Sequence, residues 1–425
     1  MTRRRARTKG ATFALFTLLA LGAVAGAATG GHVEHRASAA CAEPTPRCAV
    51  TATPFLGADG RLWLTYAVAG KVYGAVSRDE GKSFGAPFVI AAPVGEPLDD
   101  NGEARPKIVA LGDGTLVASF TTKPEKGFEG TIHVTRSTDA GKSFSPPRPL
   151  VDGKGQRFET FILGADGRRL YAAWLDKRDA QEAREKGEAF EGSGVAVAWS
   201  DDGGASFSGK KILLDHSCEC CRIGAALDRD GRPAFIWRQV FENNQRDHMA
   251  AKLSADGAAL IGSRVSSDQW ATSCPHQGPA MAIDAAGRWH VAWFTRGKAR
   301  QGLFYARSED GGKSFSEPER IGDPEQAPQR PQLLADGDAL YRAWKEFDGT
   351  TTRILAQVSR DGGKSFDAPR AIATTLDASD HPLLIASKGV VYLSWLTRNE
   401  GYRLLPLARG HADAGRASFA TASER

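Results

Sequence analysis

One eight-residue pattern occurs five times in this chain of 425 residues. Its shared letters are Ser-x-Asp-x-Gly-x-Ser-Phe, and each copy follows a run of residues that favour β-strands. Asp and Ser side chains can bond backbone N–H groups within a turn, and Gly supplies a positive φ. The pattern therefore predicts a hairpin turn, and its recurrence predicts a repeat architecture. The copies are Ser77–Phe84, Ser137–Phe144, Ser200–Phe207, Ser308–Phe315 and Ser359–Phe366.

A second repeated element precedes these copies. A Gly, in most cases after Asp, is followed by an apolar run that often ends in Trp, which is typical of a buried strand. The spacing of these runs suits a four-stranded unit. The predicted strands are Leu62–Tyr66, Leu116–Phe120, Leu170–Trp174, Pro233–Trp237, Trp289–Trp293, Leu340–Trp344 and Val391–Trp395.

The eight-residue pattern resembles the Asp-box, or bacterial neuraminidase repeat, of the sialidase superfamily. That resemblance covers about residues 51–407 and implies an all-β fold, a β-propeller in which each box is a turn between the two outer strands of a blade. Seven strand runs favour seven blades, with six as the alternative because sialidases have six. The long gap between the third and fourth boxes holds one decayed copy, Ser254–Gly257. The charged, helix-prone segment Ala180–Glu191 is interpreted as one long loop.

Residues 1–40 have the composition of a signal peptide or N-terminal anchor. A basic start from Arg3 to Lys9 precedes the apolar run Ala11–Ala28, and Ala37–Ala39 offers a small-x-small cleavage site. We therefore expect the chain to consist of this leader, a single propeller domain over residues 41–410, and a tail over residues 411–425. The expected location is periplasmic or secreted, with membrane contact only through an uncleaved leader.

The basic balance of the chain belongs to this leader. Residues 1–40 hold six of the 55 Lys and Arg residues and one of the 50 Asp and Glu residues, so the remainder holds 49 of each. No cationic excess remains that would indicate a nucleic-acid partner. Export also places the six cysteines in an oxidising compartment.

Four of the seven predicted entries of innermost strands into the central channel carry arginine. Converging guanidinium groups suit a carboxylate, so they predict an acidic ligand. The alternative is that these arginines cap the repeat by pairing with Glu103 or Glu159. The four are Arg105, Arg157, Arg222 and Arg330.

The resemblance to sialidases also implies a hydrolase hypothesis for an acidic sugar. Sialidases combine three arginines, an Asp acid and a Tyr nucleophile. The candidates here are Asp176 or Asp179 as the acid and Tyr402 as the nucleophile. The Arg-Ile-Pro motif of those enzymes is absent from the sequence, and two further units precede Arg157, which disturbs the expected order.

The most unusual local feature is a cysteine cluster at the start of the fourth unit. Thiolates with imidazole are soft ligands that suit copper or zinc. Disulfides are the alternative, because they are the default for exported cysteines, and a redox-active pair is a third interpretation. The residues concerned are Cys218, Cys220, Cys221, Cys274 and His276, with Trp270 nearby as a candidate ligand contact.

These patterns lead to two hypotheses of function. The leading one is a non-hydrolytic binding or assembly protein of the cell envelope, with a Cys/His-rich site at the channel mouth and an acidic sugar or an envelope protein as partner. The alternative is an exo-sialidase-like glycoside hydrolase that acts on an acidic sugar.

Overall fold

The apolar runs that follow the Gly turns form the most buried strands of the protein. In the computed structural model, which describes residues 41, 43–126, 129–271 and 276–409, every residue of β2 (Leu62–Val68), β6 (Leu116–Thr122) and β10 (Leu170–Asp176) is buried. All seven predicted runs lie inside strands. The other four are β14 (Pro233–Phe241), β18 (Trp289–Arg296), β22 (Ala339–Phe347) and β26 (Val390–Thr397).

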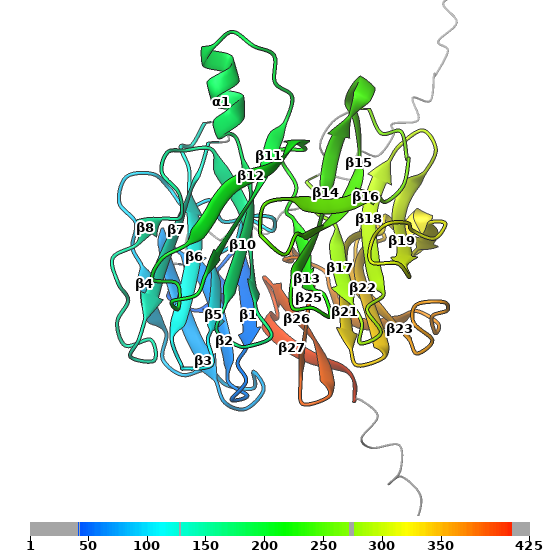
Figure 1. The fold of residues 1–425 in the computed structure, drawn as a ribbon. Coiled ribbons are helices and arrows are strands. Elements are labelled where there is room, and N and C mark those ends of the chain that lie inside the picture. The colour runs from blue at the N-terminus through cyan, green and yellow to red at the C-terminus, as the bar shows by residue number, and fades with distance from the viewer. Residues whose placement is uncertain (1–40, 42, 127–128, 272–275, 410–425) are drawn as a thin grey trace, which may run out of the picture. The chain divides into compact units, whose positions relative to one another are not determined.

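Each of these strands is the second of an antiparallel set (Figure 1). The first strands are β1 (Ala52–Leu56), β5 (Lys107–Ala110), β9 (Gln156–Leu163), β13 (Gly224–Leu227), β17 (Ala280–Ile283), β21 (Gln329–Asp336) and β25 (Leu383–Ser387). The third strands are β3 (Lys71–Ser77), β7 (Thr131–Ser137), β11 (Ser193–Ser200), β15 (Gln245–Leu253), β19 (Gln301–Ser308), β23 (Thr352–Ser359) and β27 (Gly401–Arg409). The fourth strands are β4 (Phe88–Ala91), β8 (Arg148–Pro149), β12 (Ser208–Ser217), β16 (Leu260–Arg264), β20 (Glu319–Ile321) and β24 (Arg370–Thr375).

The first strands bring the sets together. They contact one another in chain order from β1 to β25, and β25 contacts β1. Two sets, β9–β12 and β13–β16, share one hydrogen-bonded sheet through the pair Ser217 and Gln239. Apolar clusters between successive sets, such as the one that packs Val117 and Trp174 together, form the core. The arrangement is an all-β fold of several four-stranded sheets.

The five copies of the eight-residue pattern fold into the same turn between a third and a fourth strand. In the first copy, Ser77 Oγ donates to Asp79 Oδ1 at 2.7 Å and accepts from the Gly81 N–H at 2.8 Å. Asp79 also accepts from the N–H of Ser83 at 2.9 Å. Gly81 has a φ of 80°, which an L side chain rarely adopts. These local bonds explain why the pattern recurs.

The loop predicted over Ala180–Glu191 differs from the structure, which has helix α1 (Arg178–Glu185) there. Asp176 accepts a hydrogen bond from the N–H of Arg178 at 3.0 Å at the start of the helix. Glu182 and Lys186 form an i,i+4 ion pair at 2.6 Å on its exposed side. The segment therefore adopts the helix that its composition favours, because it is not part of a sheet.

Three single-turn 3-10 helices complete the elements, η1 (Pro46–Cys48), η2 (Glu242–Asn244) and η3 (Pro324–Gln326). Cys41 and Cys48 form a disulfide, and η1 contacts β26 and β27. Within the described residues, no helix has the length and apolarity needed to cross a membrane. The predicted leader 1–40 and the whole of the expected tail 411–425 lie outside the described residues, as does Cys274.

Candidate functional site

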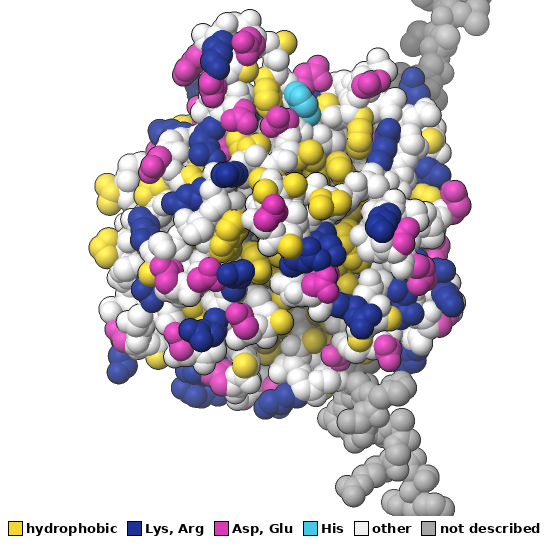
Figure 2. All heavy atoms as spheres, viewed as in Figure 1, with side chains coloured by type: hydrophobic (Ala, Val, Ile, Leu, Met, Phe, Trp, Pro, Cys, Tyr) yellow, Lys and Arg dark blue, Asp and Glu magenta, His cyan; other side chains and the backbone are white. Residues whose placement is uncertain are grey.

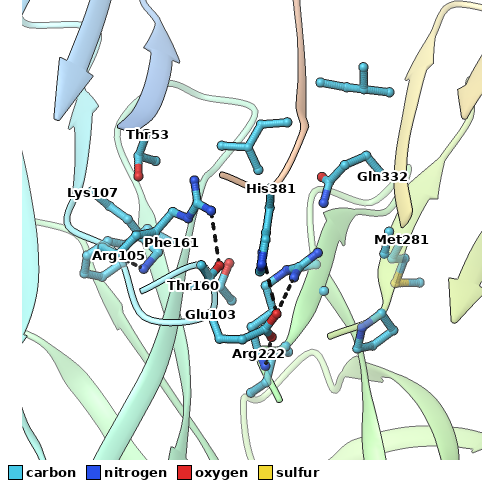
Figure 3. Close-up of a pocket in the computed structure, with 18 of the residues that line it drawn as sticks. Thr53, Glu103, Arg105, Lys107, Thr160, Phe161, Arg222, Met281, Gln332 and His381 are labelled. Carbon is cyan, nitrogen blue, oxygen red and sulfur yellow. Dashed lines mark hydrogen bonds and ion pairs between the residues drawn. The ribbon is translucent and has the colours of Figure 1, made fainter. Parts of the chain in front are cut away.

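A cavity of about 350 Å³ lies where the first strands meet. Residues from each of the strands β1, β5, β9, β13, β17, β21 and β25 line it, together with residues that directly precede some of them (Figure 3). Its size is at the lower end of the range for small-molecule sites. Of the four arginines predicted at strand entries, Arg105 and Arg222 line the cavity, whereas Arg157 and Arg330 are not among the described residues that line it.

The carboxylate of Glu103 is the centre of the polar side of this cavity. It accepts hydrogen bonds from Arg222 NH1 at 3.0 Å, from Arg330 NH1 at 2.7 Å, and from the backbone N–H groups of Arg222 and Gly278 at 2.9 and 3.1 Å. His381 Nδ1 lies 3.7 Å from the same carboxylate, and Figure 3 shows the two side chains pointing toward one another. One buried carboxylate thus serves two guanidinium groups.

The other two predicted arginines have carboxylate partners of their own. Arg105 forms a two-point ion pair with Asp380, with distances of 3.0 and 2.7 Å from its two terminal nitrogens. Arg157 donates from Nε to Asp99 at 2.7 Å. Sequence reasoning named Glu103 and Glu159 as partners and missed Asp380 and Asp99. The only signal for Asp380 was its place directly before His381-Pro382, at the seventh strand entry.

Burial alters the pKa values of two further basic residues of the cavity, Lys107 and His381. Lys107 Nζ donates to the carbonyl of Arg105 at 2.8 Å and to Glu159 Oε1 at 3.3 Å, and burial lowers its pKa. Burial, followed by the charges of Arg330 and Arg105, holds the pKa of His381 well below its usual value, so its imidazole is neutral at pH 7.

The cationic side chains of this network are paired with buried carboxylates. Five cations, Arg105, Lys107, Arg157, Arg222 and Arg330, are paired with four carboxylates, Asp99, Glu103, Glu159 and Asp380. In addition, Arg222 NH2 is buried and has no hydrogen-bond partner among the described residues. One guanidinium nitrogen of the network is therefore an unused donor among the described residues.

The structure does not bring the candidate hydrolase residues into this cavity. Tyr402 lies on β27, accepts a hydrogen bond from Ser394 Oγ at 3.0 Å and packs edge-on against Phe84; burial raises its pKa. Asp176 is fully buried and accepts from Trp174 Nε1 at 2.8 Å. Asp179 lies on α1, where burial raises its pKa. None of the three lines the cavity that the described residues form.

Three of the residues predicted to form the cysteine cluster do lie close together. The sulfurs of Cys218, Cys220 and Cys221 are buried and lie within 4.8 Å of one another. Cys220 is disulfide-bonded, so its sulfur is not available as a thiolate in this state. A hydrogen bond from the Cys221 thiol lowers the pKa of Cys218 and raises that of Cys221.

The remaining members of the cysteine prediction are dispersed. Cys274 lies outside the described residues, and His276 is exposed, with its carbonyl bonded to Arg330 NH1. Trp270 is 2% exposed, and the guanidinium of Arg238 lies 4.0 Å from the centre of its ring. In this structure Trp270 packs in the core instead of facing the cavity.

No family model matches the chain, and no curated protein matches it. Among solved structures, it is similar to an ulvan lyase, a polysaccharide lyase, at 13% identity and a TM-score of 0.56, over 83% of this chain and 91% of that one. It is also similar to a protein of unknown function from Dyadobacter fermentans at 17% identity and a TM-score of 0.48, over 72% and 94%. A Trypanosoma rangeli sialidase mutant matches at 12% identity and a TM-score of 0.43, over 69% and 51%. At such an identity the likeness to the lyase shows the fold alone, that of a β-propeller.

Proposed function

We propose that this chain is a non-hydrolytic binding protein of the cell envelope, and that its cavity takes a small anionic ligand. One observation carries the proposal: Glu103 is shared by two arginines, while Arg222 Nη2 is buried and has no hydrogen-bond partner among the described residues. A buried donor that has lost its water gains most from an anion, because the charge-assisted hydrogen bond restores what desolvation removed.

Binding of a small carboxylate measured by titration calorimetry tests this proposal. Arg222→Gln removes the unused donor and one positive charge, so we expect at least a tenfold loss of affinity. Arg360→Gln is the matched control, because Arg360 is an exposed arginine of the turn after β23. Equal binding by the two variants would refute the role of Arg222.

The alternative, a sialidase-like hydrolase, has less support. Its acid and nucleophile have to face the sugar that the arginines hold, yet Asp176 is buried and Tyr402 is half-buried, and both are bonded to other partners. We expect no turnover of a fluorogenic sialoside. Turnover that Tyr402→Phe abolishes would establish the hydrolase and overturn the non-hydrolytic proposal.

The blade count and the Asp-box assignment belong to the same proposal. Seven first strands contact in sequence and return to β1, which supports seven blades. Five turns with the same Ser–Asp–Gly hydrogen bonds support the Asp-box family. A crystal structure of the domain in which one four-stranded set is missing from the ring would favour six.

Export is proposed from residues 1–40 alone. The intact mass of protein recovered from the periplasm should lack the mass of this leader. A full-length mass in a cytoplasmic fraction would contradict both export and the envelope location.

A second proposal concerns the cysteine cluster, as a soft-metal site or as a disulfide centre. Three sulfurs within 4.8 Å have the proximity that copper or zinc requires, but Cys220 has to be reduced before it can be a ligand. Elemental analysis after reduction and loading with copper(I) or zinc separates the two. Stoichiometric metal that is lost in Cys218→Ser supports the metal site, and its absence leaves the disulfide interpretation.

A further inference from the structure

The cysteine cluster retains two thiols while Cys220 is disulfide-bonded. Cys218 and Cys221 are not in disulfides, and the three sulfurs lie within 4.8 Å of one another. A zinc–thiolate bond is about 2.3 Å long, so one soft metal ion of similar size can reach two sulfurs at such a separation. Cys218 and Cys221 therefore form a pair of candidate ligands that needs no prior reduction of Cys220.

Two arginines supply positive charge to this pair. Arg246 Nη1 lies 3.5 Å from Cys218 Sγ. Arg238 is 1% exposed, and its charge favours the thiolate forms of Cys218 and Cys221. Arg238 Nη2 donates to the Phe294 carbonyl at 2.9 Å, whereas Nε and Nη1 are buried without a hydrogen-bond partner among the described residues. No carboxylate of that part of the chain bonds to this guanidinium group, so a negatively charged metal site beside it would compensate its charge.

The charge of the loaded site distinguishes copper(I) from zinc(II). Two thiolates around copper(I) keep one net negative charge, which one guanidinium group balances. The same two thiolates around zinc(II) are neutral and leave Arg238 uncompensated.

The number of available ligands favours the same metal. Structural zinc is almost always held by four ligands, whereas copper(I) is stable between two thiolates. No His, Asp or Glu of the described residues belongs to the group that the three sulfurs form. Softness and coordination number therefore both favour copper(I) at Cys218 and Cys221.

The cluster lies just below the surface. The side chain of Glu219, which stands between Cys218 and Cys220 in the chain, is 40% exposed, whereas none of the three cysteines is more than 4% exposed. A single ion has only this thin layer to cross. The sulfurs are therefore more accessible to an ion than to a larger molecule.

We infer that Cys218 and Cys221 bind one copper(I) ion as a pair of thiolates while Cys220 stays disulfide-bonded, and that this pair does not hold zinc. The inference rests on the proposed soft-metal function of the cysteine cluster. On binding, each of the two sulfurs forms one bond to copper, and a proton that it carried is released to solvent. Arg238 and Arg246 offset the negative charge of the loaded pair.

Titration of the non-reduced mature protein with copper(I) or with zinc tests this inference. Ascorbate keeps the copper reduced and leaves disulfides intact, and bathocuproine disulfonate competes for copper(I) as a coloured indicator. We expect one equivalent of bound copper(I), no retained zinc, and two sulfur neighbours of copper in X-ray absorption.

The other outcomes separate this inference from the proposal on which it rests. Metal bound only after reduction with dithiothreitol, zinc held as tightly as copper(I), or a third sulfur neighbour would overturn the inference and leave the soft-metal proposal intact. Binding of neither metal before or after reduction would overturn that proposal as well.

Matched variants identify the ligands and the charge. Cys218→Ser and Cys221→Ser should each lower copper(I) affinity by at least about a hundredfold, the upper end of the loss for an outer-shell partner. Arg246→Gln should weaken affinity about fivefold, because it removes a charge-assisted contact with Cys218. Arg360→Gln, in the exposed turn after β23, is the control and should keep the wild-type affinity. A thermal melt confirms folding first, and full affinity in a folded serine variant would contradict the pair.

Discussion

Oε1 of Glu103 lies 2.7 Å from NH1 of Arg330, although 227 residues of sequence separate them. Arg105 and Asp380 are related in the same way across 275 residues. Both pairs are almost completely buried. Charged contacts between first strands of distant sets thus hold the centre of the fold and the wall of the cavity together. On the face shown in Figure 2, by contrast, acidic and basic side chains are interspersed over the surface.

Removing the Glu103 carboxylate, which Arg222 and Arg330 share, should strongly destabilise the protein. Glu103→Gln leaves Arg222 and Arg330 buried without a carboxylate, so we expect the free energy of unfolding to fall by about 3–5 kcal/mol in urea denaturation. Glu309→Gln is the control, because the Glu309 side chain is 57% exposed and its ion pair with Arg307 is a surface contact. That control should change stability by less than about 1 kcal/mol. Similar losses in both variants would show that Glu103 has no special role.

Gly278 allows its backbone N–H to reach Glu103. A Cβ at this position would overlap Cγ of Arg222 and lie 2.8 Å from Glu103 Oε2. Gly278→Ala should therefore cost about 1–3 kcal/mol of stability and weaken anion binding. Gly85→Ala, where a Cβ would lie 3.7 Å from its nearest neighbour, the Val76 carbonyl oxygen, should have neither effect. A fully stable Gly278→Ala protein with normal affinity would contradict this geometry.

The turn aspartates should make the protein sensitive to acid. Hydrogen bonds from the side chain and N–H of Ser143 lower the pKa of Asp139 to about 2. A carboxyl whose folded pKa is lowered contributes stability above its unfolded pKa, about 4, and that contribution is lost as the pH falls towards 2. The melting temperature should fall between pH 5 and 2.5, and less steeply in Asp139→Asn. Asp338→Asn, in the exposed turn between β21 and β22, should keep the wild-type slope; an unchanged slope in Asp139→Asn would exclude this contribution.

The disulfide at the start of the domain should stabilise the last set of strands. Cys41 and Cys48 close a short loop, and within it the carbonyl of Pro44 accepts a hydrogen bond from the Tyr66 hydroxyl at 3.0 Å. Cys41→Ser with Cys48→Ser should lower the free energy of unfolding by about 2 kcal/mol under non-reducing conditions. Hydrogen exchange should rise first in β26 and β27, which η1 contacts. Equal stability of the double variant and the wild type would mean that the loop does not support these strands.

Much of the fold was predictable because its signals are local. The turn at Ser137–Phe144 depends on hydrogen bonds within eight residues, and the buried strand around Trp174 depends on an unbroken apolar run. Helix α1 lies in an insertion between β10 and β11, where the repeat gives no signal. Its helix-prone segment was therefore interpreted as a loop.

The candidate site was predictable in part for a different reason. The arginines were identified from their repeated place at strand entries, but their partners were not. Glu159, expected to pair with an arginine, instead accepts from Lys107, Ser119 and Thr121. The pairing of each carboxylate with a guanidinium group depends on contacts between segments that are far apart in the chain. No local sequence pattern predicts such contacts.

By itself, the sequence determined the repeating unit, its turns and the places where arginine enters the centre, because each follows from bonds between near neighbours. Only the tertiary structure decided that one carboxylate would pair with both Arg222 and Arg330, and that Tyr402 would pack against Phe84. The tertiary structure also decided which side chains line the cavity, since a side chain on a first strand faces the cavity or the core according to how the first strands meet. The physical reason is the same in each case: desolvation and pairing of charges depend on what surrounds a group in space.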